Sequence, residues 1–328
     1  MPQRIVFPEP GKVELRSFEL PRPGPQDLQL RTLHSLVSIG TECTLLHQRY
    51  ERPSHFSKMF SFPQLKTGVQ AVARIEAIGA EVRGFSIGQP VYIRQAHCSH
   101  ATLPSKDCSP IPAGADLRQA SWAGLAKTAY RAAWAGRFGP GQNVLIIGAG
   151  PVGQMAVRWA HVMKAESITL VDPCQSRLDM AALGGRVRGL CGEAAQCQEA
   201  LAEIADGHGA SVVVDSTGHP EVLGDALNAA GRYGKVILLG DTGYPSQQHL
   251  NSAMMSKGLT LQAVHESHDI DGWTQERIDS LFFDHLVSGQ FQLQGLITHE
   301  FMPEDFESVY ETACGDPRDV MGLLIGWR

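Results

Sequence analysis

The sequence has no apolar run of membrane-spanning length, and its first residues include no apolar segment of the signal-peptide kind. Positive charge does not predominate, because the chain has 28 lysine and arginine residues and 34 aspartate and glutamate residues. Its formal net charge is therefore -6. Nucleic-acid binding usually needs a basic surface. These absences favour a cytoplasmic protein with neither a nucleic-acid nor a membrane partner.

Paired cysteines are missing as well. The chain has seven cysteines, an odd number, and none of them forms a Cys-x-x-Cys pair. Scattered spacing of this kind argues against a disulfide framework and favours reduced thiols. The seven positions are Cys43, Cys98, Cys108, Cys174, Cys191, Cys197 and Cys314.

What the sequence does contain is an apolar strand pattern that runs into a glycine turn, followed by a helical pattern and a second strand ending at Asp172. In a dinucleotide site the first glycine permits a tight turn, the second lets backbone approach a pyrophosphate, and the third lets the helix pack on the strand. The helix N-terminus then offers N–H groups to the phosphates. The predicted cofactor-binding residues of the turn are Gly148, Gly150, Pro151, Val152 and Gly153.

The acid at the end of the second strand bears on the choice of cofactor. A carboxylate at Asp172 is placed to bind a ribose diol and would repel a 2′-phosphate, which favours NAD over NADP. Arg177 lies in the next predicted helix and is a further cofactor-binding candidate, able in principle to meet a 2′-phosphate. The sequence therefore predicts an NAD site, with Arg177 as the one residue that argues for the alternative.

Length and pattern predict two domains of different class. At 328 residues the chain exceeds what one small core usually organises. Residues 1 to about 115 show short alternating strands separated by proline and glycine turns, whereas strands and helices alternate after Leu117. Such alternation predicts a doubly wound parallel sheet, with ligands at the carboxyl ends of the strands. The segment Gln48–Phe62 has neither the helical nor the strand period of apolar residues. Its aromatic residues either anchor a loop or form a wall or lid over a bulky substrate.

The order of these patterns resembles the medium-chain dehydrogenase/reductase superfamily over nearly the whole chain. Four stretches carry the resemblance: Ser38-Ile-Gly-Thr-Glu42, Gly68-Val-Gln-Ala-Val-Ala-Arg-Ile-Glu-Ala-Ile-Gly79, the glycine turn, and Gly295-Leu-Ile-Thr-His299. The resemblance implies a GroES-like β-rich catalytic domain, from residues 1–117 and 291–328, and a Rossmann NAD-binding domain, from residues 118–290. It also implies a small-molecule substrate bound between the domains, and a homodimer.

The departures from that family concern zinc. Where zinc-dependent members carry a cysteine, a histidine and an acid, this chain has Ile39, Val69 and Gln70, and the remaining ligand position falls on Gly124 or Ser121. Catalytic zinc needs about three protein ligands, and isoleucine and valine have no lone pair. The sequence therefore predicts no catalytic metal. The four-cysteine structural zinc lobe is also missing, which leaves His97, Cys98 and His100 as a non-standard metal site to be tested.

Among zinc-free members, the bacteriochlorophyllide dehydrogenase branch looks similar in three places: the Gly-Thr-Glu42 turn, the Gly-Leu-Ile-Thr-His299 segment and the ending at Trp327. That similarity implies oxidation of an alcohol to a ketone on a large substrate. Two alternatives stay open: an NADPH-dependent enoyl or quinone reductase, and a nucleotide-binding protein without catalytic activity.

Without zinc, a side chain must handle the proton that accompanies hydride transfer. Thr41 matches the proton-relaying hydroxyl of zinc-dependent members, and Thr128 matches a threonine that faces the cofactor. Lys127, beside it, is a candidate for binding an anionic substrate. Histidine is the usual proton handler near neutral pH, and the sequence does not select among its 13 histidines. The predicted catalytic residues are Thr41, His47, His265 and His268.

Overall fold

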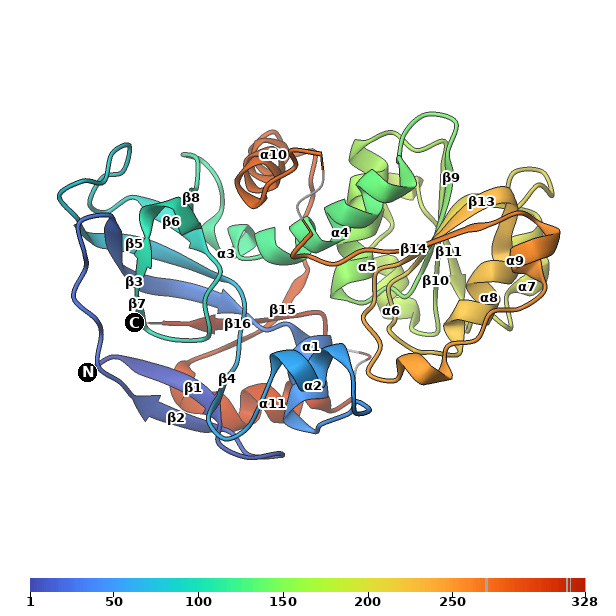
Figure 1. The fold of residues 1–328 in the computed structure, drawn as a ribbon. Helices are drawn as coiled ribbons and strands as arrows, with labels where there is room; N and C mark the ends of the chain where they lie inside the picture. Colours follow the sequence, from blue (N-terminus) through green and yellow to red (C-terminus); the bar gives the residue numbers. More distant parts are fainter. Residues whose placement is uncertain (269–270, 317, 319, 328) are drawn as a thin grey trace.

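A computed structural model describes residues 1–268, 271–316, 318 and 320–327 as two domains, each built on its own large sheet (Figure 1). No helix in this described part of the chain is long and apolar enough to cross a membrane. Both chain ends lie in the same domain, beside the seven-stranded sheet (Figure 1).

The domain in the middle of the chain is organised by a six-stranded parallel sheet with the order β11-β10-β9-β12-β13-β14. The central strands are almost wholly apolar because helices cover both faces, and Val144, Leu145 and Ile146 are each 1% exposed or less. The strands are β9 (Asn143–Ile147), β10 (Ser167–Asp172), β11 (Arg188–Cys191), β12 (Ala210–Asp215), β13 (Ala230–Leu238) and β14 (Thr260–Ala263). The predicted doubly wound sheet is confirmed.

Helices of this domain connect the strands and cover the sheet (Figure 1). The α-helices are α3 (Leu117–Ala120), α4 (Ala123–Gly136), α5 (Pro151–Val162), α6 (Gln175–Asp179), α7 (Gln198–Ala202), α8 (Val222–Ala229), α9 (Ala253–Ser256) and α10 (Gln275–Val287). Short 3₁₀ turns are η2 (Leu183–Gly185) and η3 (Pro245–Gln247).

The second domain combines both ends of the chain in one sheet. Its order is β15-β16-β3-β5-β6-β8, with β7 also paired to β3, so the last strand of the chain lies between β15 and β3. The strands are β3 (Asp27–Leu36), β5 (Ala71–Ile78), β6 (Pro90–Ile93), β7 (His100–Pro104), β8 (Cys108–Pro110), β15 (Ile297–Phe301) and β16 (Gly322–Gly326). The GroES-like plus Rossmann fold class is confirmed; the limits at 117/118 and 290/291 stay a prediction.

A small antiparallel sheet and three helices complete this domain. The strands are β1 (Gln3–Phe7), β2 (Glu14–Ser17) and β4 (Leu65–Lys66). The helices are α1 (Ile39–Leu46), α2 (His55–Met59) and α11 (Phe306–Cys314), with 3₁₀ turns η1 (Ser105–Asp107) and η4 (Pro303–Asp305).

The helical pattern that begins at Leu117 does not form one continuous helix, because α3 ends at Ala120 and α4 begins at Ala123. Trp122 is fully buried and packs against the backbone of Gly322 in β16, where an added Cβ would lie 2.5 Å from its ring. This docking of the indole on the returning strand fixes the chain direction at the break. A hydrophobic pattern cannot show such a break, since the apolar period continues through it.

The segment Gln48–Phe62 contains a helix that its sequence did not predict. Ser54 and Ser57 form a reciprocal capping box at the start of α2, which stabilises one short turn of helix. Phe56 is buried and stacks on Tyr50, with ring centroids 5.8 Å apart. The aromatic side chains therefore do pin this segment, and they also line a hollow of about 550 Å³ together with neighbouring polar residues.

The expectation that all cysteines are reduced is wrong for one pair. Cys43 on α1 and Cys314 at the end of α11 form a disulfide, with Cα atoms 5.6 Å apart. The two cysteines are 271 positions apart in the sequence, so their spacing carries no signal of the pairing. The packing of α1 against α11 brings them together.

The disulfide predicts a thiol count. Unreduced, denatured protein should give five reactive thiols with a thiol reagent, and reduced protein seven, because five described cysteines are free. Cys43→Ser should lower the free energy of unfolding by about 2–4 kcal/mol in urea. Ser replacement of the free, exposed Cys191 is the matched control. Seven reactive thiols in protein purified without reductant would contradict the pairing.

Candidate active site

The glycine turn between β9 and α5 has the geometry that a pyrophosphate needs. Gly148 has a φ of +97°, and a Cβ there would lie 2.8 Å from Thr217. A Cβ at Gly153 would lie 1.9 Å from the carbonyl oxygen of Gly148, so only glycine permits this helix to start so close to the strand. Gly150 has open space beside it and precedes Pro151 at the first position of α5. Open space next to free helix N–H groups fits a phosphate.

Asp172 lies at the carboxyl end of β10, next to this turn. Its Oδ2 accepts a hydrogen bond from the backbone N–H of Ala149 at 2.7 Å, and its Oδ1 accepts one from Cys174 at 2.8 Å. The carboxylate is thus fixed against the turn and 6% exposed. The turn and the acid, separate in sequence, are thus in direct contact.

The two remaining candidates for cofactor binding, Arg177 and Thr128, form hydrogen bonds with backbone carbonyl groups of the protein. Arg177, on α6, donates a hydrogen bond to the carbonyl of Val320 in the other domain, at 3.2 Å. The hydroxyl of Thr128 donates to the carbonyl of Gly124 one turn earlier on α4, at 3.0 Å. Neither interaction selects a cofactor.

The residues predicted to stand at the superfamily's zinc-ligand positions carry few possible ligand atoms. Ile39 and Val69 offer no ligand atom, and the Oε1 of Gln70 accepts a hydrogen bond from the backbone of Leu125 at 3.2 Å. A Cβ at Gly124 would lie 2.5 Å from that same Oε1 and 2.7 Å from the hydroxyl of Tyr92. Gln70 and Tyr92 therefore occupy the space that a ligand side chain at position 124 would need.

The sequence left open whether Gly124 or Ser121 stands at that ligand position. The structure places Gly124 against Gln70, whereas the hydroxyl of Ser121 donates to Arg118 at the end of α3, at 2.6 Å. The assignment of the ligand position to Gly124 or Ser121 stays a prediction.

His97 belongs to a buried hydrogen-bond network rather than to a metal site with Cys98 and His100. Its ring nitrogens lie 2.8 Å from the hydroxyl of Ser35 and 3.2 Å from the carboxylate of Glu42. In the described part of the chain, His97, Cys98 and His100 do not bring their ligand atoms together. The network explains why a histidine stands at position 97.

The centre of that network is Glu42, on α1, which is 1% exposed. Its carboxylate accepts hydrogen bonds from the hydroxyls of Thr67 at 2.5 Å and Tyr310 at 2.6 Å, and from the backbone of Ser38 at 2.7 Å. Burial alone would raise the pKa of Glu42, but His97 and these hydrogen bonds hold its pKa below the ordinary value. The carboxylate is therefore a structural anion that ties α1 to α11.

Lys127 does not face the cleft as a solvated binding group. It is 2% exposed, and its Nζ lies 3.4 Å from the carboxylate of Glu266 and 3.1 Å from the side-chain oxygen of Gln275. Glu266 also pairs with Arg94, which directly follows β6, so this charge cluster joins the two domains. Burial lowers the pKa of Lys127. The cluster assigns Lys127 a structural role in place of the anion-binding role considered from the sequence.

Asp279, on α10, is the most strongly shifted acid beside that cluster. It is fully buried and accepts a hydrogen bond from the hydroxyl of Ser109 in β8, at 2.6 Å. Burial raises the pKa of Asp279 to about 7. The folded state therefore retains a proton that the unfolded chain releases near pH 4.

This raised pKa predicts a pH-dependent stability. Because the folded state binds the extra proton, the contribution of Asp279 to the free energy of unfolding is fully present below about pH 4. This contribution is lost as the pH rises through about 7. The loss is at most about 4 kcal/mol, from about three pKa units at roughly 1.4 kcal/mol each. Asp279→Asn should remove this dependence, so its Tm should rise relative to wild type between about pH 4 and 8. A Tm difference that stays constant over that range would contradict the assignment.

The four residues predicted as catalytic are not all brought together. His265 follows β14 at the carboxyl edge of the parallel sheet, and its ring centroid is 5.8 Å from that of the exposed His268. Thr41 lies half-buried in the first turn of α1, and His47 lies exposed at the end of that helix. No hydrogen bond or ring contact among the described residues joins either of them to His265.

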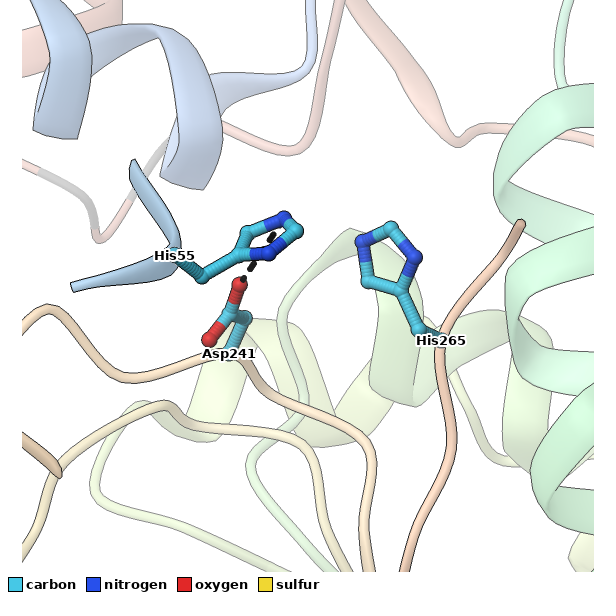
Figure 2. A group of neighbouring side chains, drawn as sticks. All are labelled: His55, Asp241 and His265. Atoms are coloured by element: carbon cyan, nitrogen blue, oxygen red, sulfur yellow. Dashed lines mark ion pairs between the residues drawn. The ribbon is translucent and has the colours of Figure 1, made fainter. Parts of the chain in front are cut away.

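The structure adds two residues that the sequence did not select, His55 and Asp241. His55 begins α2 in one domain, while Asp241 follows β13 and His265 follows β14 in the other (Figure 2). The His55 Nε2 lies 4.0 Å from the Asp241 Oδ2, and the His55 and His265 ring centroids are 5.0 Å apart. Asp241 could have been selected from the sequence only because it follows a predicted strand. No local pattern in the sequence selects His55.

The electrostatics of this cluster reflect partial burial. Burial raises the pKa of Asp241, although His55 and His265 oppose the shift. Burial also lowers the pKa of His265, which favours its neutral imidazole. A neutral imidazole beside a carboxylate at the cleft can accept a proton or bind a cation.

Comparison with known proteins agrees with this fold. Residues 151–281 match the family model described as zinc-binding dehydrogenase, a region that excludes Ile39, Val69, Gln70 and Gly124. L-threonine 3-dehydrogenase from Bacillus licheniformis is 30% identical over 52% of this chain and 48% of the relative. The enzyme of the same name from Aliivibrio fischeri is 25% identical over 93% of each chain.

Solved structures resemble the whole chain. An Escherichia coli oxidoreductase/dehydrogenase of unknown specificity, involved in membrane biogenesis, has a TM-score of 0.86 at 20% identity, covering 100% of this chain and 99% of its own. An Escherichia coli alcohol dehydrogenase complexed with NADH has a TM-score of 0.83 at 17% identity, and a Sinorhizobium meliloti dehydrogenase bound to NADP has 0.81 at 16%; each match covers 99% of both chains.

The family match, the L-threonine 3-dehydrogenase relatives and the solved dehydrogenase structures support the resemblance to the medium-chain dehydrogenase/reductase superfamily, and these relatives are oxidoreductases. The resemblance read from the sequence is confirmed at this level.

Proposed function

We propose that the protein is an NAD(H)-dependent oxidoreductase that interconverts a secondary alcohol and a ketone without zinc at the superfamily's zinc position. The observation that carries the proposal is the contrast between the two halves of the cleft. Asp172 and the glycine turn fit a dinucleotide, whereas Ile39, Val69 and Gly124 cannot bind a metal. Solved relatives with the same fold bind NADH or NADP, which supports a nicotinamide cofactor here.

The proton is proposed to be handled by His265. When bound, nicotinamide accepts or donates the hydride at its C4 atom. The imidazole of His265 takes the hydroxyl proton of the alcohol in one direction and returns it to the carbonyl oxygen in the other. Its Nδ1 lies 2.7 Å from the hydroxyl of Ser267, which orients the ring and leaves Nε2 free toward the cleft. Thr41, His47 and His268 stay predictions with no such arrangement around them.

A bulky substrate fits the proposal because the hollow of about 550 Å³ lies within the segment that carries His55. The hollow is lined by Gln48, Tyr50, Arg52, Pro53, Ser57, Phe60, Ser61 and Phe62. Aromatic walls with a few polar groups are typical of sites for large, mostly apolar ligands. The homodimer and the cytoplasmic location stay predictions.

Asp172→Ser tests the preference for NAD. Loss of the carboxylate should weaken NADH binding by about tenfold, which is roughly 1.4 kcal/mol, and should weaken NADPH binding much less, because the repulsion of a 2′-phosphate is also removed. Fluorescence titration with both cofactors measures this, with thermal melts to show that the variant is folded. Tighter binding of NADPH than NADH by the wild-type protein would overturn the preference.

His265→Ala tests the proton handler. We expect kcat for a ketone substrate to fall by about 10²-fold or more, with the Kd for NADH within a factor of about two, because general acid–base catalysis contributes at this scale. His249→Ala, an exposed histidine in the loop after β13, is the matched control. An unchanged kcat in His265→Ala would remove this residue from the mechanism.

Product analysis decides between this function and its alternatives. Reduction of a carbonyl yields an alcohol, whereas an enoyl or quinone reductase would deliver the hydride to carbon of an activated double bond. Cofactor binding without turnover across carbonyl and enone panels would indicate the non-catalytic alternative.

A further inference from the structure

We propose that His55, Asp241 and His265 form a binding site for a divalent transition-metal ion that bridges the two domains. The site is separate from the superfamily's zinc position and uses other residues. The binding itself is independent of the proposed function; its effect on turnover rests on that function, through His265.

The donor atoms are those that such ions prefer. Two imidazole nitrogens and one carboxylate oxygen form a ligand set typical of Zn²⁺, Co²⁺ and Ni²⁺. One such atom from each residue lies within 4.8 Å of the others, the one group of this kind among the described residues. Bonds of about 2.0–2.2 Å in a tetrahedral site place ligand atoms roughly 3.3 Å apart. Side-chain adjustments of about 1 Å would close the site, and Figure 2 shows the two rings on opposite sides of the gap.

The backbone beneath the three ligands is held in place by contacts between the domains. The N–H of Glu51 donates to the carbonyl of Gly243 at 2.8 Å, and the N–H of Ser246 donates to the Glu51 side chain at 3.0 Å. A Cβ at Gly243 would lie 2.1 Å from the carbonyl oxygen of Arg49, so the two backbones touch. These contacts fix the Asp241 loop against the segment that carries His55.

The outer contacts also suit coordination. Metal-bound histidines usually engage their second ring nitrogen in a hydrogen bond that orients the ring. The Nδ1 of His265 has such a partner in the hydroxyl of Ser267, at 2.7 Å. The side chains of His55 and Asp241 are 44% and 41% exposed, so an ion can enter and water can complete its coordination.

Metal binding and proton transfer would compete for the same atom. A metal bound to the Nε2 of His265 occupies the lone pair that the proposed function uses to accept a proton. The ion would also tie α2 to the ends of β13 and β14 across the cleft. Zn²⁺ should therefore inhibit turnover, and a chelator should restore it.

The binding test uses Co²⁺, whose visible absorption reports tetrahedral coordination, with Zn²⁺ as a competitor. Chelator-treated full-length protein should bind one equivalent of Co²⁺, which Zn²⁺ displaces. His55→Ala, Asp241→Asn and His265→Ala should each weaken Co²⁺ binding at least tenfold, because each removes one of three ligands. His249→Ala should bind as wild type, and thermal melts of every variant check folding.

Failure to bind Co²⁺ or Zn²⁺, or binding that all three ligand variants retain, would overturn the proposal. The result is independent of turnover, since binding is measured without substrate. Metal binding by a protein with no oxidoreductase activity would contradict the proposed function alone, whereas an active enzyme that binds no metal would contradict only this proposal. Inhibition by Zn²⁺, compared with each variant's own metal-free rate, should be lost in His55→Ala.

Discussion

The backbone contact between Gly243 and Arg49 is the constraint on which the candidate site depends. Glycine is required at 243 because a Cβ would lie 2.1 Å from the Arg49 carbonyl oxygen. The contact, strengthened by the hydrogen bond from Glu51 to Gly243, holds the segment before α2 against the loop after β13. The meeting of these two backbones brings the His55 Nε2 to 4.0 Å from the Asp241 Oδ2.

Further contacts between the two domains follow from the path of the chain. The last strand of the chain, β16, lies between β15 and β3, so the GroES-like domain is completed only after the Rossmann domain has been traversed. Arg177 contacts Val320 just before that strand, and the pair of Glu266 with Arg94 joins the domains again on another side. The two domains are thus joined by contacts of backbone and charge at several places.

Local patterns in the sequence were enough for the fold and for the cofactor turn. Buried parallel strands are recognisable in a sequence as apolar runs. The need for glycine at Gly148 and Gly153 follows from the turn alone, and an added Cβ at either position would lie too close to its neighbours. The break at Trp122 and the disulfide of Cys43 with Cys314 could not be predicted, because each depends on packing between distant segments.

Of the candidate site, His265 could be predicted because ligands gather at the ends of parallel strands. His55 could not, since its position is set by a capping box and by contact with the other domain.

The replacement of the zinc ligands is a change of packing as well as of chemistry. Gln70 and Tyr92 take the space beside Gly124 that a side chain at this position would fill. The polar groups that we propose to act on a substrate oxygen lie instead where two strand ends meet α2.

The most direct test of this account is the transfer of deuterium from C4-deuterated NADH by protein from which all metal has been removed by chelation. The account predicts that deuterium appears on the carbinol carbon of the alcohol formed from a ketone. No transfer by the metal-free protein, with transfer restored by added zinc, would contradict it.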